Sequence, residues 1–351
     1  MLPYLLSWSF FASVSLLTPL RRLTGLTLLL VGSFLMLLIG LREQVGGDWG
    51  NYLPYVENAA SLSFRQTLLE TEPGYALLNW FGARAGGGVH FVNTLCGAIF
   101  SIGLVSFCRT QPRPWLALTL AFPYLVVVVA MGYTRQGVAI GLEMLALLAL
   151  ERDRLLPFLG WIALASTFHR TVLVLLILPA ATLSGSLRFS QLIRLALLAG
   201  SAYGLYSAVI APDIDYYVQG YIDAEYQSQG ALIRVVLCLL PALLFLPFRH
   251  RFDLSPDSQR IWTLISALAV TAALGLATVA SSTAVDRLAL YLIPLQLQIG
   301  SRLPDTGLLG VDPGVWNKLL VLFSLAVLLV WLLFAGHSSY WLPYRNLLLP
   351  F

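Results

Sequence analysis

The stretch LTGLTLLLVGSFLMLLIGL, residues 23–41, contains no charged side chain and is bounded by Arg21-Arg22 on one side and Arg42 on the other. A helix that crosses a bilayer core of about 30 Å needs roughly 20 mostly apolar residues. The stretch has this length and composition. It therefore predicts a transmembrane helix with a cationic group at each end.

The whole chain has the same character. Of its 351 residues, 58% are hydrophobic and 11% are charged, and the mean hydropathy is +0.80. Soluble domains carry roughly 25% charged residues, so a soluble enzyme, a disordered chain and a disulfide scaffold are excluded. Three cysteines lie in or beside apolar segments without metal-ligand spacing. The net charge of +4 comes without a basic cluster, which excludes a nucleic-acid partner.

The same length rule predicts about twelve spans in a single transmembrane domain over 1–351. They are expected near 2–20, 23–41, 89–107, 114–132, 136–150, 155–168, 171–183, 193–210, 231–248, 261–280, 287–301 and 317–335. Two long hydrophilic stretches separate spans. The first, 42–88, is expected to contain a short interfacial helix over 73–84. The second, 211–230, is acidic and rich in Tyr, and we interpret it as a lid-like loop or an aromatic belt.

The basic residues predict the orientation, because cytoplasmic loops are enriched in Lys and Arg. With twelve spans, most of these residues fall on one side, which places both termini outside. The cytoplasmic set is Arg21, Arg22, Arg109, Arg113, Arg152, Arg154, Arg188, Arg194, Arg249, Arg251, Arg260, Arg302 and Lys318.

Four arginines oppose this bias at the outer ends of spans: Arg42, Arg135, Arg170 and Arg287. Each of them alone is explained by snorkelling, in which the guanidinium reaches the headgroups. Together, beside His and carboxylates, they favour an anion site on the outer face.

Two acidic, aromatic segments lie in the first hydrophilic stretch. Asp48 follows a pair of glycines and precedes Tyr52 and Tyr55, whose rings suit stacking on sugars. Glu72 precedes Pro73 and Tyr75 at a helix start, where the positive helix end stabilises a carboxylate. The alternatives are a surface loop closed by an Asp turn and a simple helix cap.

Two further clusters lie at span ends. One span begins with Tyr133, Arg135 and Gln136. Glu143 lies two turns deeper in the same span, where its carboxyl group either belongs to a proton path or forms a hydrogen bond between buried helices. His169-Arg170 lies between two apolar spans, where imidazole is a candidate base or a structural donor. Asp286-Arg287 opens another span, with an ion pair between these neighbours as the alternative.

These motifs resemble, in order and over nearly the whole chain, the EpsG family of exopolysaccharide-assembly membrane proteins. The matching segments are Arg42…Gly47-Asp48-Trp49…Tyr52, Glu72-Pro73-Gly74-Tyr75, Thr134-Arg135-Gln136-Gly137-Val138-Ala139, Phe168-His169-Arg170-Thr171, Asp286-Arg287 and Trp341-Leu342-Pro343-Tyr344-Arg345-Asn346. The family is similar to Wzy-type polymerases. The resemblance implies an all-α polytopic, GT-C-like glycosyltransferase in the bacterial inner membrane that joins polyprenyl-diphosphate-linked oligosaccharides on its outer face, without a metal or another cofactor.

The chemistry of that reaction suggests roles for the candidate residues. Forked Arg donors suit a diphosphate leaving group, a base must accept the proton of the acceptor hydroxyl, and a carboxylate can stabilise the oxocarbenium-like state. The assignments are His169 as base, Asp48 or Glu72 as orienting or competing carboxylate, Arg42, Arg135, Arg170 and Arg287 as the diphosphate cradle, and Tyr52, Tyr55, Tyr75, Tyr133 and Gln136 as the glycan path.

Expected partners are the lipid-linked oligosaccharide and, in the same pathway, a chain-length regulator and a flippase. Three alternatives remain open: a transporter or flippase of the lipid-linked unit, a related glycan ligase or acyltransferase, and a structural scaffold. A transporter predicts an internal repeat and polar residues through the whole membrane thickness. The sequence has no convincing repeat, and its ionisable groups lie mostly at the outer edge.

Overall fold

The computed structural model describes residues 1–182, 189–205, 207, 230–278 and 282–348. The described part is helical and contains no strand, apart from one isolated bridge between Arg42 and Asn346. The predicted lid-like loop 211–230 lies, except for Gly230, outside the described residues.

The chain divides into two compact units. The first consists of residues 1–145, 164–169 and 311–351, and the second of 146–163 and 170–310. Two helices, α8 (Thr134–Leu150) and α9 (Leu155–Ser166), begin in one unit and end in the other.

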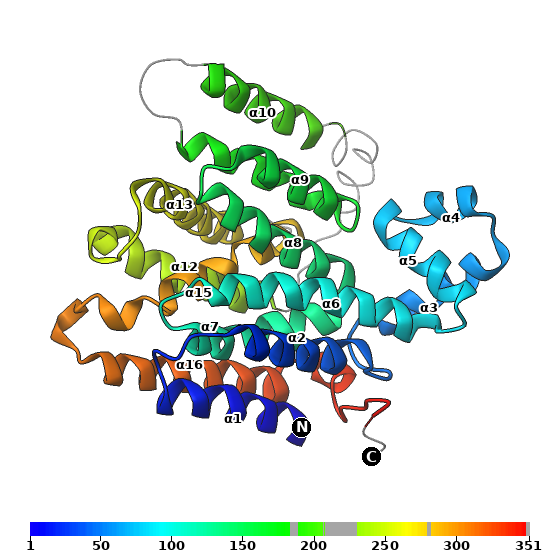
Figure 1. Ribbon diagram of the computed structural model, residues 1–351, viewed down its shortest axis with the longest axis horizontal. Helices are drawn as coiled ribbons and strands as arrows, with labels where there is room; N and C mark the ends of the chain where they lie inside the picture. The colour runs from blue at the N-terminus through cyan, green and yellow to red at the C-terminus, as the bar shows by residue number, and fades with distance from the viewer. Residues whose placement is uncertain (183–188, 206, 208–229, 279–281, 349–351) are drawn as a thin grey trace. The chain divides into compact units, whose positions relative to one another are not determined.

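The first unit is built from long apolar helices and a group of short ones. Its remaining elements are α1 (Leu2–Leu17), α2 (Gly25–Gly40), α3 (Trp49–Ser61), α4 (Phe64–Glu70), α5 (Pro73–Arg84), α6 (Gly88–Arg109), α7 (Pro114–Ala121), the π-helix η1 (Phe122–Ala130), α16 (Pro313–Phe334) and η9 (Ser338–Tyr340). Figure 1 shows α3, α4 and α5 grouped beyond the ends of α2 and α6. The segment 42–88 therefore holds three helices where the sequence predicts one, and α5 occupies the predicted range.

The second unit has fewer long helices. Its remaining elements are η2 (Arg170–Thr182), α10 (Phe189–Leu205), α12 (Ala231–Phe248), η5 (Arg249–Arg251), α13 (Pro256–Thr278), α14 (Ser282–Ala289), η6 (Leu290–Leu292), α15 (Pro294–Gly300), η7 (Leu303–Asp305) and η8 (Leu308–Gly310).

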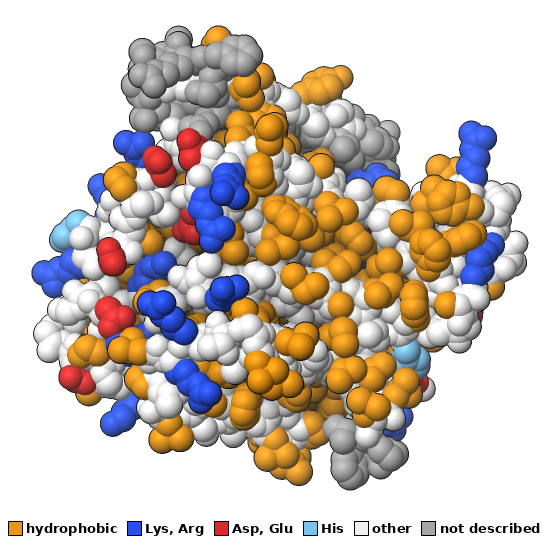
Figure 2. Space-filling model, in the orientation of Figure 1, with side chains coloured by type: hydrophobic (Ala, Val, Ile, Leu, Met, Phe, Trp, Pro, Cys, Tyr) orange, Lys and Arg blue, Asp and Glu red, His pale blue; other side chains and the backbone are white. Residues whose placement is uncertain are grey.

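Helix length and exposed surface identify a membrane protein. Among the described residues, four helical segments are long and apolar enough to cross a bilayer, namely α6, α12 with η5, α13 and α16, and several shorter apolar helices accompany them. Large apolar side chains are exposed, including Leu17, Leu274 and Phe334 at 80%, 64% and 78%, and hydrophobic side chains cover much of the face in Figure 2. Water penalises such a surface whereas lipid does not. The chain is a multi-pass α-helical membrane protein.

Close helix contacts in the first unit depend on small residues. A Cβ added to Gly103 of α6 would lie 1.9 Å from the carbonyl oxygen of Gly141 on α8. These two helices approach each other through backbone, as small residues allow in membranes. This packing fixes α8, whose first turn carries Arg135.

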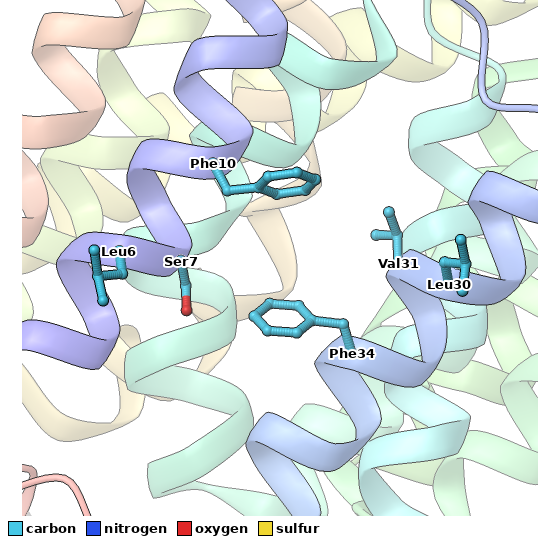
Figure 3. A pocket seen from close by; sticks show the side chains of 6 residues that line it. All are labelled: Leu6, Ser7, Phe10, Leu30, Val31 and Phe34. Atoms are coloured by element: carbon cyan, nitrogen blue, oxygen red, sulfur yellow. The ribbon is translucent and has the colours of Figure 1, made fainter. Parts of the chain in front are cut away.

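An apolar pocket of about 410 Å³ lies between α1 and α2 (Figure 3). Phe10 of α1 and Phe34 of α2 point into it, and it is also lined by Leu6, Ser7, Leu30 and Val31. Its lining has no charged group, so it suits hydrocarbon rather than a polar ligand.

The C-terminal tail packs against the end of α2. The Trp341 indole donates to the carbonyl of Val127 in η1 over 2.7 Å, and the Tyr344 hydroxyl donates to the carbonyl of Leu38 over 2.7 Å. The backbone N–H of Glu43 donates to the carbonyl of Arg345 over 3.0 Å. The tail thereby fixes the segment that begins the first candidate cluster.

Candidate functional site

The start of α5 is anchored to the segment that carries His169. The Gly74 N–H donates to the carbonyl of Thr167 over 2.8 Å, and a Cβ on Gly74 would lie 2.3 Å from the Thr167 hydroxyl oxygen. Only glycine fits this approach without displacing Thr167. Because Glu72 immediately precedes α5, the contact brings Glu72 beside His169.

Glu72 pairs with Arg135 from the first turn of α8. The Arg135 Nη1 lies 2.6 Å from Glu72 Oε2 and 3.0 Å from the Thr71 hydroxyl, which itself donates to Glu72 Oε2 over 2.9 Å. The side chains of Arg135 and Glu72 are 28% and 13% exposed. A charge-assisted pair with so little water around it is stronger than a surface pair.

His169 completes this group without a hydrogen bond. Its Nδ1 lies 3.8 Å from Glu72 Oε1, which is beyond hydrogen-bond reach. Neither ring nitrogen has a hydrogen-bond partner among the described residues, and both are shielded from solvent. The imidazole therefore lies next to a carboxylate that is engaged elsewhere.

The Glu72 carboxyl is strongly acidic in this setting. Burial favours its neutral form, whereas His169, the Arg135 guanidinium and the Thr71 hydroxyl favour the carboxylate, and the balance lowers the pKa of Glu72 to about 2. A carboxylate with this pKa is a weak base at neutral pH. The contacts favour a positioning role for Glu72 over that of a competing base.

The tyrosines surround Arg135 at different depths. The guanidinium carbon lies 5.8 Å and 5.9 Å from the ring centroids of Tyr55 and Tyr75, within cation–π range. The rings of Tyr52 and Tyr75 contact each other in a tilted arrangement, with centroids 5.6 Å apart. Tyr52 and Tyr75 are buried, whereas Tyr55 and Tyr133 are half-buried. The two half-buried rings are the better placed to meet a sugar.

Asp48 is joined to the same group through Tyr52. It precedes α3 and accepts hydrogen bonds from the Tyr52 hydroxyl over 3.3 Å and the Asn51 amide over 3.5 Å. Burial and the Asp48 charge raise the pKa of Tyr52, so its phenol stays protonated and able to donate.

Arg42 has a different environment from Arg135. It is fully buried, and its guanidinium donates to the carbonyls of Ile39 and Val45 and to the Thr134 hydroxyl. These partners tie the end of α2 to the start of α8. The contacts favour a structural role for Arg42, as the residue that holds Thr134 and thus the neighbouring Arg135.

The remaining predicted arginines belong to the second unit. Arg170 is the first residue of η2 and Arg287 lies in α14, and both are exposed. Asp286 forms a buried ion pair with Arg234 of α12. A diphosphate cradle made from all four predicted arginines remains a prediction.

Two further polar residues lie on α8. Gln136 and Glu143 are both buried, at 5% and 1% exposure. The Glu143 Oε2 has no hydrogen-bond partner among the described residues. The proton path proposed for Glu143 remains a prediction.

Sequence reasoning missed several residues of these clusters. Thr71 and Thr134 both bond the arginines, and His90 Nε2 lies 2.5 Å from Glu43 Oε2 with its ring 5.5 Å from that of Trp49. Thr71 directly precedes Glu72, a signal that could have found it. The His90–Glu43 pair spans 47 positions and leaves no local signal.

Comparison with known proteins places the chain in a family. The family model described as the EpsG family matches residues 25–346, which includes every candidate site residue named above. No curated protein and no solved structure matches the chain. Since the match covers nearly the whole length, this multi-pass membrane protein belongs to the EpsG family.

Proposed function

We propose that this protein is a polymerase that joins polyprenyl-diphosphate-linked oligosaccharide repeats into an exopolysaccharide, capsule or O-antigen. The EpsG family consists of membrane proteins similar to polysaccharide polymerases. In the proposed reaction an acceptor sugar hydroxyl attacks the anomeric carbon of the donor glycan, and the polyprenyl diphosphate leaves. The enzyme is then a glycosyltransferase that needs no metal.

One observation carries the proposal: an arginine, a carboxylate and an imidazole converge at Arg135, Glu72 and His169, in a setting flanked by tyrosines. A diphosphate leaving group needs fixed cations where its charge develops. Arg135 offers a planar fork of donors at the start of an apolar helix. His169 is the proposed base, and Asp48, held by Tyr52, is the proposed carboxylate for the acceptor.

The other predicted residues take supporting parts in this proposal. Arg170 and Arg287 would add cations for the diphosphate, while Arg42 positions Thr134 beside Arg135. Tyr55 and Tyr133 would contact the glycan, with Tyr52, Tyr75 and Gln136 behind them. The segment 211–230 would guide or cover the glycan.

The proposal also includes an orientation. About twelve spans of a GT-C-like arrangement would place both termini and the site on the outer face of the bacterial inner membrane. There, sugar donors arrive already linked to lipid, and a flippase and a chain-length regulator of the same pathway would be partners.

Purified protein incubated with a polyprenyl-diphosphate-linked repeat tests the proposal. We expect a ladder of glycan products, unchanged by a metal chelator, and no ladder from a variant with Arg135→Gln. Arg65→Gln, on the exposed face of α4, serves as the matched control. A wild-type protein that moves the lipid-linked unit across vesicles without lengthening it would instead be a transporter.

A further inference from the structure

One carboxylate lies between two partners in the candidate site, with a different oxygen facing each. Glu72 Oε2 accepts from Arg135 Nη1 at 2.6 Å, while Glu72 Oε1 faces His169 Nδ1 at 3.8 Å. Only the first contact is a hydrogen bond. An approach of roughly 1 Å would turn the second into one.

A hydrogen bond to Glu72 would stabilise the His169 imidazole. Both nitrogens of His169 are shielded from solvent and lack a partner among the described residues. A shielded polar atom without a partner is destabilising. A hydrogen bond from Nδ1–H to Glu72 would remove that cost and fix the tautomer, leaving Nε2 free to accept a proton.

The present pairing of Glu72 would not survive the arrival of a diphosphate. Arg135 is the cation to which Glu72 is bound, and a diphosphate carries more negative charge than a carboxylate. Two anions close to one guanidinium repel each other, and the one with the smaller charge is the weaker competitor. The His169 Nδ1 lies 3.8 Å from Glu72 Oε1, so a short movement of the displaced carboxylate brings it to the imidazole.

We propose that Glu72 is a shared carboxylate that passes from Arg135 to His169 when a lipid diphosphate binds Arg135. This rests on the function proposed above and adds to it the way in which donor binding prepares the base. Glu72 is a positioning residue in this scheme, because it acts on the substrate only through its two neighbours.

The chemical step then balances. The acceptor hydroxyl oxygen forms a bond to the anomeric carbon while the bond from that carbon to the diphosphate oxygen breaks. The electron pair leaves with the diphosphate, which Arg135 holds, and the hydroxyl proton goes to Nε2 of His169. Glu72 stabilises the resulting imidazolium through Nδ1–H, as a carboxylate does for a catalytic histidine.

Glu72→Gln separates binding from turnover. With its carboxylate gone, Arg135 is fully available, so the Kd for a polyprenyl diphosphate should fall about tenfold. The base is no longer oriented, so kcat for polymer formation should fall about 10²-fold. Glu70→Gln, at the end of α4, is the control that should change neither value.

A second measurement uses the wild-type protein and does not depend on the stability of that variant. The chain has four histidines, so ¹⁵N-histidine spectra with a His169→Gln reference assign the His169 signals. Addition of a polyprenyl diphosphate should convert its Nδ1 signal to that of a hydrogen-bonded N–H.

The outcomes separate the two proposals. If the wild-type protein polymerises, any one of three results overturns the shared carboxylate alone. These results are weaker diphosphate binding by Glu72→Gln, an unchanged kcat in that variant, and a His169 spectrum that the diphosphate does not alter. Wild-type protein that neither binds a polyprenyl diphosphate nor makes polymer overturns the proposed function itself. Tighter binding with slower turnover supports the transfer.

Discussion

Arg135→Lys tests whether the fork of the guanidinium, and not only its charge, is needed. The contacts of Arg135 with Thr71 and Glu72 both use Nη1. Nη2 and Nε are therefore the donors left for a phosphate group. The three N–H donors of lysine share one nitrogen on a flexible stem, so a lysine that keeps Glu72 lacks the second and third fixed nitrogens that a guanidinium offers to the leaving group.

The size of the effect follows from this count. Loss of one preorganised donor to a developing anion costs about 2.7–4 kcal/mol, or 10²–10³ in kcat. We expect kcat for polymer formation by Arg135→Lys to fall by that factor. The fold should survive, because lysine keeps the charge that pairs with Glu72.

The assay is the rate of ladder growth from a lipid-diphosphate-linked repeat with purified protein, alongside a thermal melt. Arg65→Lys on α4 is the matched control, since Arg65 is exposed. A kcat within threefold of wild type in a folded Arg135→Lys protein would refute the reasoning, because a point charge would then replace the fork.

Three further predictions concern the same site. His169→Ala should leave the single lipid-linked repeat unpolymerised and accumulating, as measured by mass spectrometry of extracted lipids; full-length polymer would remove His169 as the base. The pKa of Glu72 is lowered to about 2 from 4.5. Its contribution to the free energy of unfolding, at most about 3 kcal/mol, is therefore present above pH 4.5 and is lost as the pH falls toward 2. The melting temperatures of wild type and Glu72→Gln should converge over that range, and a constant difference would contradict this. Gly74→Ala should destabilise the protein by about 1–3 kcal/mol through overlap with the Thr167 hydroxyl, and adding Thr167→Ala should restore the melting temperature unless the strain lies elsewhere.

The apolar runs of the sequence predicted the long helices well, because an uninterrupted apolar composition is enough to identify such a helix. The expected range 231–248 is helix α12 itself, and the short helix expected over 73–84 is α5. Helices α3 and α4 were missed since they carry Asn, Glu and Arg among their apolar residues, and α3 includes Pro54. Short helices of mixed composition depend on tertiary packing for their stability, which a single sequence does not display.

Ion pairing over long separations was the least accessible to sequence. Asp286 and Arg287 are neighbours, but successive residues of a helix point in different directions. Asp286 pairs with Arg234, 52 positions away, and Arg287 lies at the surface. A charge at the end of a predicted span therefore does not identify its long-range partner.

Arg42 and Arg135 show why a shared sequence context does not imply a shared role. Both follow or begin an apolar run, and both were predicted to hold a diphosphate. Arg42 is fully buried and donates to carbonyls at the end of α2 and to the Thr134 hydroxyl. Arg135 contacts Glu72 through Nη1 alone, so its Nη2 and Nε are left for another partner. Because Thr134 and Arg135 are adjacent at the start of α8, the buried arginine sets the position of the accessible one. In the proposed site, Arg42 therefore supports the position of Arg135, and Arg135 is the arginine with donors left for a ligand.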